Sequence, residues 1–190
     1  LNISSFRRRL GVVQQDTYLF AGTLEENVTM NATQPDLDRI DYAFKMCSLD
    51  AVRRRLGHRV QGESDPVEVE TEILDAGTNL SAGERQLVAM ARALYRDPEI
   101  LLLDEATASI DQETERLLQT ATEKVLDGRT SLVVAHRLST VETADRIIVL
   151  SEGQIIEQGS PSDLLSNPDG HFAQMVAAQR RKEAVAIDRA

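Results

Sequence analysis

Two adjacent carboxylates, Asp104 and Glu105, directly follow an apolar run at residues 100–103. Such a run predicts a strand buried on both faces of a parallel sheet. The carboxyl ends of these strands form the edge where open α/β folds bind ligands. Two acids there suit phosphoryl transfer, in which Asp104 would hold Mg²⁺ through its water shell and Glu105 would polarise the attacking water. The alternative is a strand that ends in solvent with two ordinary acids.

A second candidate site lies at Ser81, where a helix is predicted to begin. Ser81 and Glu84 have the spacing of a capping box, and apolar residues recur at helical spacing from Ala82 to about Arg96. Gly83 has no side chain to block the first turn at that position, so a phosphate could approach the N–H groups at the positive end of the helix dipole. A plain helix start explains the same residues equally well.

Two more polar side chains follow predicted strands. Gln15 comes after the β-branched run at residues 10–13, and its amide oxygen could reach Mg²⁺ or water. His136 comes after the apolar run at 131–135, at the same predicted sheet edge as Asp104. There it could donate a hydrogen bond to a γ-phosphate, or it could cap the next helix as an ordinary polar residue.

The elements that would position these residues alternate between strand and helix after Pro98, which predicts an α/β core. The expected buried strands are residues 100–103, 131–135, 146–150 and 154–157, and the expected helices are 112–126 and 160–180. The stretch 21–96 is predicted to be mostly helical, with residues 58–79 as a long surface loop. The last ten residues are expected to form a frayed, charged tail.

The composition excludes several classes of protein. The 190 residues carry a net charge of -10, which argues against a broad nucleic-acid-binding surface, although backbone N–H groups could still hold an anionic ligand. Cys47 is the only cysteine, so neither an intrachain disulfide nor a CxxC zinc site can form. The three histidines are too scattered to suggest a metal cluster, and the apolar runs are much shorter than the roughly 18 residues of a membrane span.

The order of these motifs resembles the nucleotide-binding domain of an ABC transporter of the exporter type, from Phe6 to about Ala178. The matching segments are VVQQDTYLFAGTLEENV for the Q-loop, LSAGE for the signature, ILLLDE for Walker B, residues 109–111 for the D-loop, and AHRLS for the switch histidine. Residues 71–77 fall where exporters carry an X-loop that touches the membrane domain. The resemblance implies a P-loop NTPase (RecA-like) fold, with a mostly parallel sheet and an inserted α-helical subdomain.

By this resemblance the cofactors are ATP and Mg²⁺, and the chain is an ATP hydrolase when part of the full-length protein. Glu105 and His136 take catalytic roles, and Gln15 and Asp104 serve the metal. Nucleotide contacts fall to Gln15, Ser81, Gly83, Asp104 and Asp111, of which Ser81 and Gly83 serve the ATP of a second such domain. The implied partners are that second domain, as a homodimer or heterodimer, and the transmembrane domain of the same transporter, at the cytoplasmic face of a membrane. No nucleic-acid partner is expected.

The resemblance also divides the chain into four parts. Residues 1–20 would be a remnant of the ATPase core with the Q-loop, and 21–96 a helical subdomain that ends in the signature helix. Residues 97–160 would return to the core with Walker B, the D-loop and the switch histidine, followed by C-terminal helices and a tail at 161–190.

Three features depart from the family pattern. Ala82 replaces a glycine of the signature, and Glu84 stands where glutamine is usual. Glu84 is expected to repel the partner's γ-phosphate modestly, unless Arg85 or another nearby cation offsets its charge. No GxxxxGK[ST] motif occurs in the sequence, so the P-loop and the membrane helices are expected upstream of Leu1, and the chain is expected to be inactive alone.

Two other functions remain open at this point. One is a chromosome-maintenance or repair ATPase head of the SMC type, whose signature more often ends in Gly-Glu. That reading is disfavoured because the stretch between Gln15 and Ser81 is short and lacks the sustained heptads of a long coiled coil. The other is a non-catalytic interaction fragment.

Overall fold

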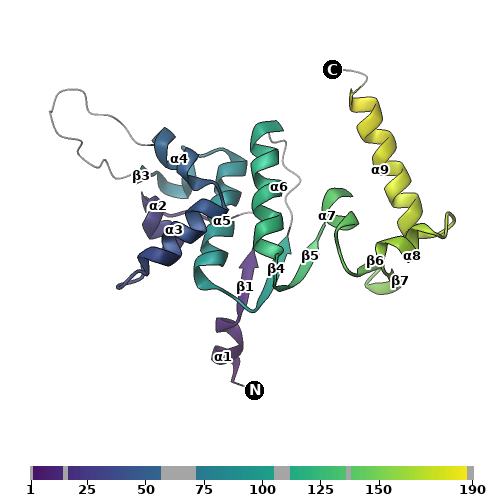
Figure 1. Ribbon diagram of the computed structural model, residues 1–190, viewed down its shortest axis with the longest axis horizontal. Helices are drawn as coiled ribbons and strands as arrows, with labels where there is room; N and C mark the ends of the chain where they lie inside the picture. Colours follow the sequence, from purple (N-terminus) through teal and green to yellow (C-terminus); the bar gives the residue numbers. More distant parts are fainter. Residues whose placement is uncertain (1, 15–16, 57–71, 105–111, 136–137, 188–190) are drawn as a thin grey trace. The chain divides into compact units, whose positions relative to one another are not determined.

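The computed structural model describes residues 2–14, 17–56, 72–104, 112–135 and 138–187 (Figure 1). The chain forms two compact units, Leu1–Val134 and Ala135–Ala190.

The first unit contains a three-stranded parallel sheet. Its strands are β1 (Leu10–Val13), β4 (Ile100–Asp104) and β5 (Thr130–Val134), in the order β1-β4-β5. The predicted strands are therefore present, with bounds that differ from the sequence prediction by at most one residue. Because β4 lies between two partners, its apolar run is the centre of the sheet, as the prediction of an α/β core requires.

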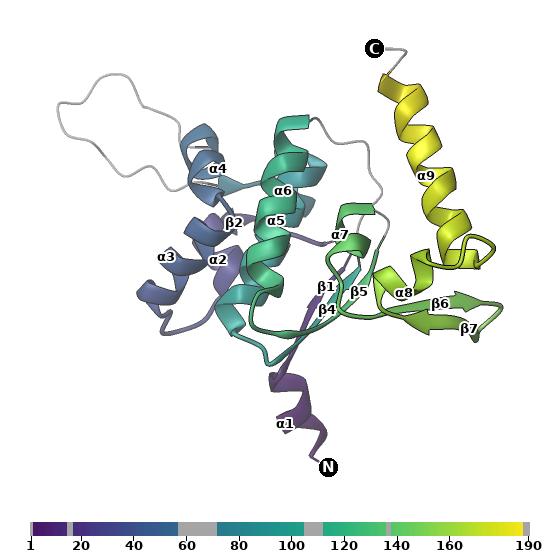
Figure 2. The same cartoon turned by 45° about the vertical axis from the view of Figure 1, so that its right-hand side comes forward.

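The other elements of the first unit are helices and short strands. They are α1 (Ile3–Arg8), β2 (Gly22–Thr23), α2 (Leu24–Thr29), α3 (Leu37–Met46), α4 (Leu49–Leu56), β3 (Glu72–Ile73), η1 (Asp75–Gly77), α5 (Ala82–Arg96) and α6 (Gln112–Leu126). The central helix is α5, which contacts α2, α3, α4, α6 and β1 (Figures 1 and 2). Most of its apolar side chains are buried, and they form the core together with apolar side chains of α2, α3, α4, α6 and one face of the sheet.

Local sequence signals fix several helix ends. Thr23 and Glu26 form a capping box at α2, and the side chain of Asp36 accepts the N–H of Arg39 at the start of α3. Asp97 ends α5 in the left-handed conformation, just before Pro98.

Cys47, which follows α3, is fully buried, and burial raises the pKa of its thiol to about 12.

The prediction that β5 is buried on both faces is wrong. Leu132 is 60% exposed and Val134 56% exposed, whereas Val133 between them packs against the core. Side chains alternate along a strand, so only one face of β5 meets the helices. Val12 on β1 is exposed for the same reason.

The second unit is built on an antiparallel hairpin of β6 (Ile147–Ser151) and β7 (Gln154–Gly159). Glu152 and Gly153 turn the chain between them, both with positive φ. The helices of this unit are α7 (Leu138–Glu142), α8 (Pro161–Leu165) and α9 (His171–Ile187), and its core is formed by Val149, Phe172 and Val176. A core of this size covers little of the hairpin. The prediction of buried strands is therefore wrong here too, and Ile148, Leu150 and Ile155 are exposed.

The C-terminal segment also differs from its prediction. The single helical stretch expected at residues 160–180 is divided into α8 and α9, and α9 continues to Ile187, inside the segment predicted to be a frayed tail. Alanine, arginine, lysine and glutamate are frequent there and favour helix.

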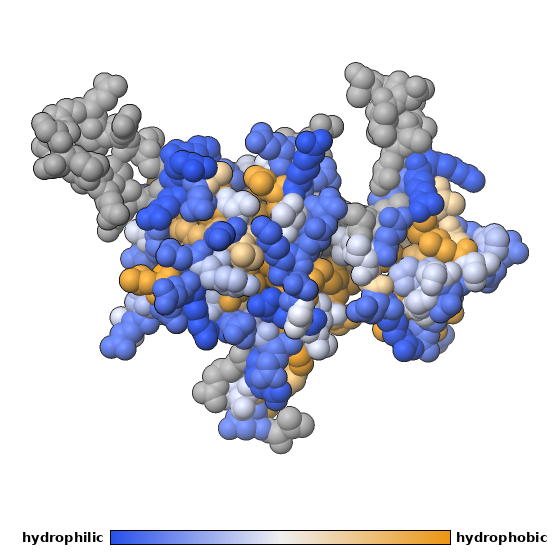
Figure 3. All heavy atoms as spheres, viewed as in Figure 1, coloured by the Kyte–Doolittle hydropathy of each residue, from blue (hydrophilic) through white to orange (hydrophobic). Residues whose placement is uncertain are grey.

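In the view of Figure 3 the described surface is mainly hydrophilic, with apolar side chains in smaller patches.

Candidate functional site

The carboxyl ends of the three parallel strands form one edge of the sheet in the first unit. Val13 on β1 lies in register with Leu103 on β4, and Asp104 lies in register with Val134 on β5. The chain therefore leaves all three strands at the same edge, where ligands bind in open α/β folds. The prediction that these strand ends are neighbours is confirmed.

One of the predicted residues at this edge is described in full. Asp104 ends β4 with an exposed side chain. Gln15, Glu105, Asp111 and His136 lie outside the described residues. Three of these four come within two residues of the end of β1, β4 or β5, so the roles assigned to them stay predictions.

The donor set at the edge suits Mg²⁺. A carboxylate oxygen such as that of Asp104 is a ligand that Mg²⁺ prefers, usually together with several waters, and an exposed strand end leaves room for both. Within the described part of the chain, no three His, Cys, Asp or Glu side chains are grouped so that they could hold a metal ion. Any metal at this edge would therefore depend on ligands beyond Asp104.

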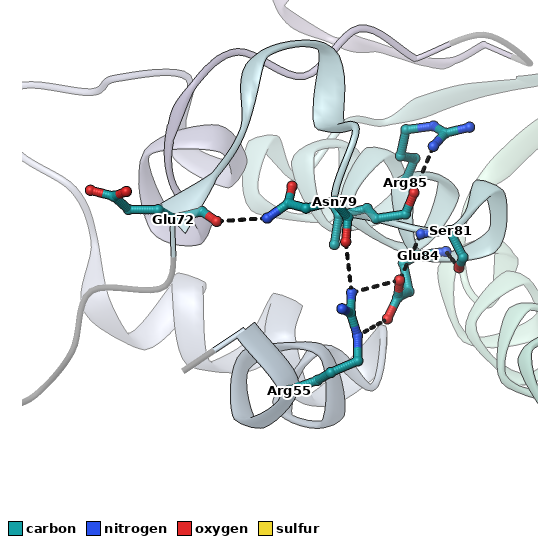
Figure 4. Close-up of polar contacts among 7 residues, drawn as sticks. Arg55, Glu72, Asn79, Ser81, Glu84 and Arg85 are labelled. Atoms are coloured by element: carbon teal, nitrogen blue, oxygen red, sulfur yellow. Dashed lines mark hydrogen bonds and ion pairs between the residues drawn. The ribbon is translucent and has the colours of Figure 1, made fainter. Parts of the chain in front are cut away.

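The predicted capping box at the start of α5 is present (Figure 4). The N–H of Glu84 donates to Oγ of Ser81 at 3.2 Å, and the N–H of Ser81 donates to Oε2 of Glu84 at 2.8 Å. Gly83 is buried in the first turn. The cap uses the N–H of Glu84, and the N–H of Arg85 donates to the carbonyl of Ser81. By helix geometry, the N–H groups of Ala82 and Gly83 are those left without an intrahelical partner.

Sequence reasoning missed the cation that pairs with Glu84. It is Arg55 in the last turn of α4, whose Nε and Nη2 donate to Oε1 and Oε2 of Glu84, both at 2.8 Å (Figure 4). Arg85, the cation considered from the sequence, instead donates to the carbonyl of Leu80 at 2.7 Å. Arg55 stands in a run of three arginines, and no local signal distinguishes it from its neighbours.

Asn79 joins the residues before the capping box to the short strand β3. Its Nδ2 donates to the carbonyl of Glu72 at 2.9 Å, and its Oδ1 accepts the N–H of Leu74 at 3.0 Å. Its own carbonyl accepts a further hydrogen bond from Nη2 of Arg55 at 3.2 Å. Asn79 and Arg55 together fix the chain immediately before α5.

A polar network centred on the buried Asn27 holds the segment that follows Gln15. Arg92 on α5 donates to the carbonyls of Tyr18 and Asn27, each at 2.7 Å, and to Oδ1 of Asn27 at 2.8 Å. Its guanidinium also lies 5.5 Å from the centroid of the Phe20 ring. No local pattern predicted this network, which holds the segment after β1 against the same helix that begins at Ser81.

Comparison with known proteins identifies the family. A family model described as "ABC transporter" matches residues 1–108. The chain belongs to the ABC transporter family. This confirms the resemblance that the order of the motifs indicated.

Relatives within the ABC transporter family include exporters. The chain is 41% identical over 181 residues, 95% of its length, to the probable multidrug resistance ABC transporter ATP-binding/permease protein YheH of Bacillus subtilis. It is 44% identical over 176 residues, 91% of its length, to an ATP-dependent lipid A-core flippase of Ralstonia nicotianae. The chain spans only 25% and 28% of the length of these two relatives.

A solved structure supports the fold. The structure of a bacterial Atm1-family ABC exporter with ATP bound matches with a TM-score of 0.75 and 39% sequence identity, over 93% of this chain and 29% of that chain. The predicted fold class, the α/β P-loop NTPase fold of ABC ATPases, is confirmed. Among the residues that the structure describes, no helix combines the length and the apolar composition of a membrane span.

Proposed function

We propose that this chain is part of the ATP-binding, ATP-hydrolysing domain that powers transmembrane export by an ABC transporter. The observation that carries the proposal is the parallel register of β1, β4 and β5. The three strands end at one edge of the sheet, and in the sequence they are followed by the Q-loop, Walker B and switch-histidine motifs, respectively. The similarity to ATP-dependent exporters supports it. The same similarity makes an SMC-type ATPase head or a non-catalytic fragment a weaker explanation.

In this proposal the sheet edge carries out the chemistry. Asp104, assisted by Gln15, would hold Mg²⁺ through its water shell, and Mg²⁺ would supply positive charge to offset that of the nucleotide phosphates. Glu105 accepts a hydrogen bond from the attacking water and orients it. His136 donates a hydrogen bond to the γ-phosphate.

The start of α5 would act on the nucleotide of a second ABC domain. The N–H groups of the first turn and the helix dipole favour an anion there, and Gly83 places no side chain in its way. We propose that Ser81 and Gly83 contact the partner's ATP, with Asp111 beside it, in a head-to-tail homodimer or heterodimer. The transmembrane domain of the same transporter would be the other partner, at the cytoplasmic face of a membrane.

The substitution Glu105→Gln in the full-length transporter tests the proposal. Glutamine keeps the shape of the side chain but not its basicity, so the variant should bind ATP and lose most of its hydrolysis. Glu113→Gln, which changes an exposed acid on α6, is the matched control and should retain wild-type turnover. Turnover of Glu105→Gln within about twofold of the wild type would remove Glu105 from the catalytic role.

A further inference from the structure

We propose that Arg55 is a positioning residue for the nucleotide-facing start of α5. It neutralises the carboxylate of Glu84 and holds the chain at Asn79, so that the first turn can accept a phosphate although it carries an acid. The inference rests on the proposed function, because it assumes that a partner's ATP approaches Ser81 and Gly83. Figure 4 shows the side chains involved.

The charge of Glu84 would otherwise oppose an anion at this helix end. A helix N-terminus carries the equivalent of about half a positive charge, which one uncompensated carboxylate would more than cancel. Glu84 occurs in the first turn of α5, one residue after Gly83. A cation that pairs with both carboxylate oxygens restores the positive character of this site.

The geometry suits an arginine in particular. The two parallel N–H···O contacts from Nε and Nη2, each 2.8 Å long, form the fork that a guanidinium makes with a carboxylate. The ammonium of lysine is a point charge and cannot reproduce this fork while also donating to the carbonyl of Asn79. Arg55 thus joins α4, the segment before the signature, and the first turn of α5.

The pair differs from an ordinary surface ion pair. Exposed pairs contribute little because water and salt screen them and long side chains lose freedom. The side chain of Arg55 is 48% exposed, but that of Glu84 is only 17% exposed, and the N–H of Ser81 also donates to its Oε2. Its carboxylate is therefore oriented before Arg55 binds it, which lowers the entropic cost of forming the pair.

The test is a double-mutant cycle in the full-length transporter, with the ATP concentration at half-maximal hydrolysis as the readout. Arg55→Gln leaves Glu84 uncompensated and should raise this concentration about fivefold at low salt, and less at high salt. Glu84→Gln keeps the capping box, since glutamine also serves at that position, and should lower it or leave it unchanged. The double variant should return to within about twofold of the wild type.

Two further variants separate positioning from folding. Arg55→Lys keeps the charge without the fork and should fall between the wild type and Arg55→Gln. Arg54→Gln, which removes an exposed arginine from the same helix, should match the wild type. The maximal rate of hydrolysis should stay the same in all variants. An equal rise in Arg55→Gln and in the double variant would overturn the proposal, because the rise would then not come from the charge of Glu84.

Hydrogen exchange gives a second readout that needs no nucleotide. In the full-length transporter, the peptide spanning residues 79–84 should exchange faster in Arg55→Gln than in Arg54→Gln, because the partner of the Ser81 N–H is no longer held. Equal exchange in the two variants would overturn the positioning role. A wild-type protein that hydrolyses no ATP would refute the proposed function instead, and the exchange measurement would still decide the role of Arg55.

Discussion

Asn27 on α2 makes the polar contacts that hold the segment between β1 and α2, and its replacement by alanine should strongly destabilise the first unit. The side chain is 0% exposed. Its Oδ1 accepts hydrogen bonds from the N–H of Phe20 at 3.2 Å and from Nη2 of Arg92 at 2.8 Å. Its Nδ2 donates to the carbonyls of Phe20 and Thr23 at 2.9 and 3.0 Å. Asn27→Ala removes all four of these bonds.

The magnitude follows from the groups left behind. A buried polar group that loses its partner costs about 1–3 kcal/mol, and three backbone groups would lose theirs. The groups belong to one network and water can reach some of them, so the losses are not additive, and we expect a total of about 3–4 kcal/mol. That is a large fraction of the roughly 5–15 kcal/mol by which a domain is stable.

Urea unfolding of the 190-residue chain, followed by circular dichroism, measures this loss. With a slope of about 2 kcal/mol per molar urea, the midpoint for Asn27→Ala should fall by about 1.5–2 M. Gln119→Ala is the control, because that amide is exposed on α6 and makes a 3.3 Å bond to Glu123 of the same helix. Asn27→Asp keeps the acceptors but loses both donors and should be intermediate. A midpoint for Asn27→Ala no lower than that of Gln119→Ala would refute the reasoning.

Two further predictions concern other parts of the chain. Gly11→Ala places a Cβ 2.6 Å from Cγ of Pro98, so it should cost about 1–3 kcal/mol in the same urea assay, and an unchanged midpoint would mean that β1 can shift aside. In the second unit, the N–H groups of Phe172 and His171 hold the pKa of Glu157 below its ordinary value of 4.5. The stability from this contact is therefore complete above pH 4.5 and is lost as the pH falls through the lower, folded-state pKa. The unfolding temperature should thus fall more steeply on acidification in the wild type than in Glu157→Gln, and parallel curves would contradict this.

Features that depend on neighbours in the sequence were predictable. The capping box at Ser81, the periodicity of α5 and the apolar run of β4 each lie within a few residues, so local rules suffice to place them. The common edge of the sheet was also predictable, because parallel strands must end on the same side.

Features that depend on distant contacts were not predictable. Arg55 reaches Glu84 across 29 positions of sequence, and only the packing of α4 beside α5 brings the two together. The exposure of β5 likewise depends on which of its faces the helices cover, and an apolar run reads the same whether one face or both are buried. The three arginines of α4 illustrate this limit, since tertiary structure alone distinguishes the one that binds Glu84.

The burial of Cys47 has a practical consequence for studying the movements of this chain. With a pKa of about 12, only about one thiol in 10⁵ is a thiolate at neutral pH, and the side chain is also out of reach of a reagent. A cysteine introduced at an exposed position, such as that of Arg54, would therefore react alone with a maleimide dye or spin label. Site-specific spectroscopy of α4 can thus begin from the natural sequence, without first removing Cys47.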